Sequence, residues 1–162
     1  MSDFHGGFYI MRDDAALAES VLELARDYLG DTEQPDDVQL VWSGRRGVGA
    51  LFVTLTRGSE HPDGWSRDWV ASNLAFGARV AREACAPTWA YTYDNIEGTE
   101  SVARFDGDGT LSHEKTTDWD EGIVRALTDL TDELAVPRVL VEYDMPFATP
   151  TYVQRLDAEF DT

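Results

Sequence analysis

The sequence has one cysteine, Cys85, and no apolar run of the roughly 18 residues that indicates a membrane-spanning helix. A single cysteine excludes a framework of intramolecular disulfides. The first residues, MSDFHGGFYIMRDD, lack the basic and apolar regions of a secretory signal. We therefore expect a cytoplasmic protein that folds without disulfides, in which Cys85 is a buried, unreactive thiol.

Basic residues are also scarce, since 13 Lys and Arg face 31 Asp and Glu, and the net charge is −18. Lys115 is the only lysine. Nucleic acids and anionic membranes are bound through cations, so neither is an expected partner. A basic protein would be attracted electrostatically. The acidity could instead be a general property of the proteins of the host organism. The sequence leaves both explanations open, a basic partner and a generally acidic set of host proteins.

Motifs of common active sites are absent as well. The chain has three histidines: His5, His61 and His113. Their separation does not match that of a zinc-ligand pair. The sequence contains no phosphate loop, no dinucleotide fingerprint and no nucleophile elbow. An EF-hand register places Arg104 and Lys115 where calcium needs oxygen ligands, so the Asp-Gly pairs of residues 106–109 indicate a hairpin turn. We expect neither a metal nor a cofactor.

The hydrophobic pattern predicts an α+β fold. A length of 162 residues fits one globular domain, residues 1–162, and the prolines of residues 145–162 favour an extended C-terminal tail. The predicted architecture is a single-layer, mixed or mainly antiparallel sheet of about six to seven strands, covered by three helices. Oligomeric state and strand order are not encoded in the pattern.

Alternating and helical spacings locate the expected elements. The predicted strands cover residues 8–11, 38–42, 48–56, 88–93, 100–106, 110–116 and 138–143. The predicted helices cover residues 14–29, 66–84 and 118–135, with a further short helix over residues 152–160. Residues 43–47 are expected to form a five-residue hairpin loop with an arginine pair at its tip. Gly77 lies inside a predicted helix, and we expect it to allow a close packing contact.

One stretch combines aromatic and acidic residues. The candidate binding residues are Trp89, Tyr91, Tyr93, Asp94, Glu97 and Glu100. Tyrosine and tryptophan are enriched in binding hot spots, and the acids would form a polar rim around them. The period-two alternation of the rings is equally typical of a sheet core. Core packing is the first interpretation of the rings, and a binding face is the second.

A second hypothesis concerns carboxylates alone. Asp94, Glu97 and Glu100 follow one predicted strand, and Glu142 and Asp144 end another. If the two strands are neighbours and parallel, these groups could gather at one end of the sheet and bind a divalent metal or act as an acid and base pair. In a chain this acidic, chance clustering of carboxylates is expected, and a solvated surface is the first interpretation of these residues.

Acidity and the lack of catalytic motifs favour a protein-binding module. We expect a regulator, an adaptor or an immunity-type inhibitor without catalytic activity, with a basic protein as its partner. Small acidic bacterial immunity proteins, which neutralise often basic toxins, share this general profile, although no motif links the chain to them. The alternative is an enzyme that uses the carboxylate cluster, with or without a divalent metal.

Overall fold

The computed structural model describes residues 4–30, 37–55, 65–94, 98–118, 124–142, 145, 147 and 152–157. The strands are β1 (Phe4–Ile10), β2 (Asp37–Arg45), β3 (Val48–Leu55), β4 (Thr88–Asp94), β5 (Thr99–Phe105), β6 (Leu111–Asp118) and β7 (Tyr152–Asp157). The helices are α1 (Ala15–Gly30), α2 (Trp65–Ala84), α3 (Val124–Leu134) and α4 (Arg138–Glu142). None of these described helices is both long and apolar enough to cross a membrane.

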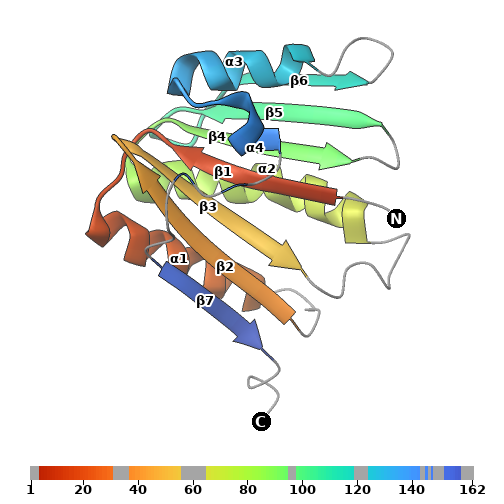
Figure 1. Cartoon of the computed structure of the whole chain (residues 1–162). Helices are drawn as coiled ribbons and strands as arrows, with labels where there is room; N and C mark the ends of the chain where they lie inside the picture. Colours follow the sequence, from red (N-terminus) through yellow and green to blue (C-terminus); the bar gives the residue numbers. More distant parts are fainter. Residues whose placement is uncertain are drawn as a thin grey trace.

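The strands form one seven-stranded sheet in the order β6-β5-β4-β1-β3-β2-β7. Every neighbouring pair in it is antiparallel. Helices α1 and α2 lie behind the sheet in Figure 1, and α3 and α4 lie in front of it. The predicted fold class, an α+β fold with an antiparallel sheet covered by helices, is therefore confirmed. Helix α4 is an addition to the three predicted helices.

The face of the sheet behind Figure 1 carries one of the two apolar clusters. Its sheet residues include Phe8, Ile10 and Leu51, which pack against α1 and α2. Helix α1 begins as predicted, because the Leu17 N–H donates a 2.7 Å hydrogen bond to the Asp14 carboxylate, as expected of an N-cap. A Cβ atom on Gly77 of α2 would lie 2.8 Å from a ring carbon of Phe105 on β5. The predicted close approach of this helix is therefore confirmed.

The opposite face carries the second cluster, beneath α3 and α4. Tyr9, Trp89 and Tyr91 of the sheet pack there with Leu127 and Leu130 of α3. Because successive side chains of a strand point to opposite faces, one strand supplies both clusters. In β1, for example, Phe8 belongs to the first cluster and Tyr9 to the second.

Two predictions near the C-terminus are wrong. Residues 138–142 form helix α4 rather than a strand, and Tyr152–Asp157 form strand β7 rather than a helix. A strand would place Val139 and Val141 on the same face. The helix instead buries Val141 and leaves Val139 48% exposed. Strand β7 is fixed by tertiary pairing, since it hydrogen-bonds along β2 at the margin of the sheet.

Three local predictions also need correction. The β2–β3 hairpin turns over Arg46 and Gly47 alone, both with positive φ (43° and 84°), because β2 continues to Arg45. Asp118 is the last residue of β6 and not the start of α3, whose described part begins at Val124. Cys85 is exposed, because its φ of 49° turns the chain just after α2 and directs the next residue, Ala86, into the core instead.

Candidate functional site

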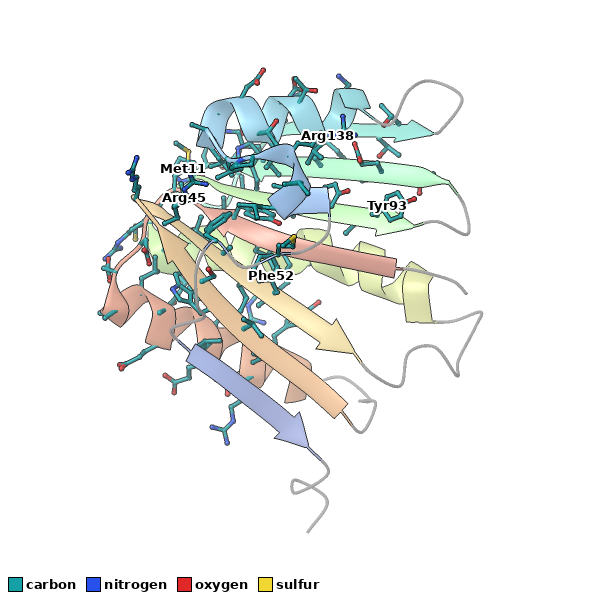
Figure 2. All side chains as sticks on the ribbon, viewed as in Figure 1. Met11, Arg45, Phe52, Tyr93 and Arg138 are labelled. Atoms are coloured by element: carbon teal, nitrogen blue, oxygen red, sulfur yellow. The ribbon has the colours of Figure 1, made fainter. Side chains whose placement is uncertain are left out.

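The aromatic strand β4 lies inside the sheet, between β5 and β1. Trp89 and Tyr91 are 2% and 1% exposed, beneath α3, and Tyr93 is half-buried. The first interpretation of Trp89 and Tyr91, core packing, is confirmed. Figure 2 shows Tyr93 at the opposite end of the sheet from Met11 and Arg45. Tyr93 is therefore the one ring of the three with substantial access to solvent.

Glu100 of β5 is buried, with 1% of its surface exposed, and so it does not belong to a polar rim. The Tyr91 hydroxyl donates a 3.2 Å hydrogen bond to one of its carboxylate oxygens, and the Leu127 N–H donates a 3.1 Å bond to the other. Glu100 is buried because the β4–β5 register pairs it with Tyr93, and so places its side chain on the face of the sheet that α3 covers. Glu100 thus binds the fourth residue of the described part of α3, and near a helix N-terminus the dipole favours a negative charge.

The structure does not describe the side chains of the remaining predicted acids. Asp94 ends β4 and Glu142 ends α4, but their side chains lie outside the described atoms, and Glu97 and Asp144 lie outside the described residues. Among the residues that the structure describes, no group of three or more His, Cys, Asp or Glu side chains could hold a metal ion. The carboxylate hypothesis therefore gains no support from the described part of the chain.

Ion pairs fasten α3 to β5 and β6. The Arg104 guanidinium donates two parallel hydrogen bonds to Glu133 of α3, at 2.9 and 3.0 Å, and a third to Asp106 at 2.6 Å. These contacts, chiefly those with Glu133, raise the pKa of Arg104 above its ordinary value. Nearby, the His113 imidazole lies 3.0 Å and the Lys115 ammonium 3.8 Å from Asp129 of α3. We call β5, β6 and α3, with the turn at residues 106–110, the outer unit.

The pairs of the outer unit leave other carboxylates exposed. Asp108 lies in the turn, Glu114 on β6 and Asp132 on α3, and all three side chains are exposed. None of them pairs with a cation among the described side chains. The Thr110 N–H donates a 2.9 Å hydrogen bond to Asp108 and lowers the pKa of that carboxyl group, which keeps it ionised. Among the described side chains, the outer unit therefore exposes carboxylates, whereas Arg104, His113 and Lys115 lie beside acids of the same unit.

Strand β6 is the margin of the sheet and of the outer unit. It follows β5 in the sheet order, and no other described strand pairs with its far side. Leu111, Ser112, Glu114 and Thr116 along it are exposed. Sequence reasoning identified this strand but not its marginal position. The signal was weak, because strand order in an antiparallel sheet depends on tertiary contacts that a single sequence does not display.

Comparisons of the chain with protein-family models, with curated proteins and with solved structures give no match. The function is consequently argued from the residues of the chain itself.

Proposed function

We propose that this chain is an acidic protein-binding module that docks a basic protein partner. It would act as a regulator, an adaptor or an immunity-type inhibitor, in the cytoplasm and without catalysis of its own. The observation that carries the proposal is the charge arrangement of the outer unit. Arg104 and Lys115 are engaged with acids of the same unit, whereas Asp108, Glu114 and Asp132 face solvent.

This arrangement supports recognition of a basic surface in two ways. With a net charge of −18, the chain attracts cationic proteins over a long range, and this accelerates their encounter. At short range, exposed carboxylates that lack a cation within the chain can pair with lysines or arginines of a partner. Such pairs confer specificity and orientation more than raw affinity.

The test is affinity capture from the native host, followed by binding measurements on the purified partner. The partner is expected to be basic and its affinity to fall as ionic strength rises, because salt screens exposed charges. A regulator or inhibitor would also change the partner's own activity on addition, whereas an adaptor would leave it unchanged.

Two matched variants separate the outer unit from the general acidity of the chain. The first combines Asp108→Asn, Glu114→Gln and Asp132→Asn. The second removes three exposed charges from α1, which lies against the other half of the sheet: Glu19→Gln, Glu23→Gln and Asp27→Asn.

The outer-unit variant is expected to lose about tenfold in affinity, since exposed ion pairs contribute roughly 0.2–1 kcal/mol each. The α1 variant is expected to bind nearly as well as the wild type. Equal losses for both variants would mean that the acidity acts without a defined site. Failure to recover any basic partner would contradict the proposed function itself.

A further inference from the structure

We propose that the edge of β6 with which no other described strand pairs binds an extended, basic segment of the partner protein, which adds a strand to the sheet. This inference rests on the proposed function and names the mode of docking. An edge strand presents a row of backbone N–H and C=O groups that can pair with another chain. Among the described strands, β6 and β7 end the sheet.

Two of the features that can protect an edge, a lysine and a register shift, occur in β6, but neither blocks most of the strand. Its sequence, LSHEKTTD, contains neither proline nor glycine over the eight residues Leu111–Asp118. Natural edges are often guarded by lysine, by proline or by a bulge. The only lysine, Lys115, extends toward Asp129 of α3, and the one register shift of the pair lies near the turn, between Arg104 and Phe105. The strand beyond that shift is regular and long enough to pair with a peptide.

The side chains along this edge indicate the chemistry of the added strand. On the face opposite α3, Glu114 is exposed and Leu111 exposes 46% of its surface. On the α3 face, His113 and Lys115 are about 40% exposed and lie beside Asp129. An added strand with lysine or arginine on one face would place these cations beside Glu114 rather than beside Lys115. Charge thus selects a basic segment and orients it.

Backbone pairing distinguishes this mode from simple charge attraction, and two synthetic peptides can test it. The first is (Lys-Val)4, which carries four lysines and has high strand propensity. The second is (Lys-Pro-Pro)4, which carries the same four lysines but adopts a polyproline conformation and lacks two of every three N–H donors. Binding and amide hydrogen exchange of the full chain are measured by NMR with each peptide at low ionic strength.

The (Lys-Val)4 peptide is expected to bind and to slow exchange of the outward-facing amides between Ser112 and Thr117. The (Lys-Pro-Pro)4 peptide is expected to bind at least tenfold more weakly and to leave this exchange unchanged. The variant Glu114→Lys should weaken (Lys-Val)4 binding about fivefold (about 1 kcal/mol), whereas Glu23→Lys on α1 should leave it unchanged. Glu23 is a matched control because it is exposed and lies against the other half of the sheet.

Equal binding of both peptides would overturn the inference, because it would show attraction by charge alone. Protection confined to β7, or to amides outside β6, would overturn it as well. Repeating the exchange measurement with the captured partner separates the two proposals. A partner that binds without protecting β6 would leave the proposed function standing and would remove strand addition.

Discussion

The buried carboxylate of Glu100 is expected to be one of the most sensitive positions of the fold. Replacing it with alanine removes the acceptor of two hydrogen bonds, one from the Tyr91 hydroxyl and one from the Leu127 N–H. Both donors lie in the buried space between β4, β5 and α3, where a lost partner is not easily replaced by water. The change therefore acts on the attachment of α3 as well as on the sheet.

The size of the effect follows from those two donors. A buried donor that loses its partner costs about 1–3 kcal/mol, so Glu100→Ala should lower the free energy of unfolding by roughly 3 kcal/mol or more. For a chain of this length, that loss corresponds to a midpoint lower by about 6–12 °C. Glu100→Gln keeps an acceptor but loses the charge near the helix terminus, so a smaller loss, of about 1–2 kcal/mol, is expected.

Urea unfolding followed by circular dichroism measures these differences. Glu114→Ala on the adjacent strand is the control, and it should change stability by less than about 0.5 kcal/mol because Glu114 is exposed. A double-mutant cycle of Glu100→Ala with Tyr91→Phe should give a coupling energy of about 1 kcal/mol. A Glu100→Ala variant as stable as the Glu114→Ala control would refute the assignment of Glu100 as the anchor of α3.

Three further predictions concern local geometry. Asp14→Ala should destabilise the chain at neutral pH, because it removes the acceptor of the Leu17 N–H. This hydrogen bond lowers the pKa of Asp14 in the folded chain below the ordinary value of 3.8. The stabilisation by Asp14 is therefore fully present above pH 3.8 and is lost as the pH falls through the lower, folded pKa. Unfolding curves of the variant and the wild type should therefore converge in acid, and a constant difference would contradict the capping role. Gly77→Ala should cost about 1–2 kcal/mol despite a better helix propensity, because the added carbon meets Phe105, and a gain in stability would mean that the ring moves aside. Gly47→Ala should cost about 1 kcal/mol through its φ of +84° alone, since no atom lies within 4 Å of the added carbon; an unchanged unfolding midpoint would argue against the two-residue turn.

The periodic spacing of apolar residues correctly predicted those helices and strands in which one whole side of the element is buried. Helix α1 could be predicted because Leu17, Val21 and Ala25 repeat on one side and its ends are marked by Asp14 and a glycine. Strand β4 could be predicted from the alternation of its rings. In both cases the local spacing agrees with the tertiary burial, so the sequence alone contains the necessary information.

The failures occurred where tertiary contacts override the local pattern. Residues 138–142 are rich in valine, yet only one side of this short segment reaches the core, and a helical turn satisfies that better than a strand. Cys85 lies between the buried residues Ala84 and Ala86, but its own left-handed φ of 49° leaves its side chain exposed. Glu100 was expected at a surface because carboxylates are rarely buried without partners. Two of its donors lie outside its own strand, Tyr91 on β4 and Leu127 on α3, which is 27 residues further along the sequence.

The same tertiary contacts bear on whether β6 can act as a docking edge. If an edge strand becomes ordered only when a partner binds, the loss of conformational entropy lowers the affinity for that partner. Here β6 is already held by Arg104, which donates to Ser112 Oγ at 3.0 Å, and by the Ser101–Thr116 hydroxyl contact at 2.9 Å. Asp129 of α3 also lies beside His113 and Lys115 of β6. Each of these contacts uses side chains and leaves the outer backbone groups of β6 unoccupied by them. The acids and hydroxyls around this edge therefore preorganise it, and Trp89 and Tyr91 of β4, two strands away, support α3 from within the core.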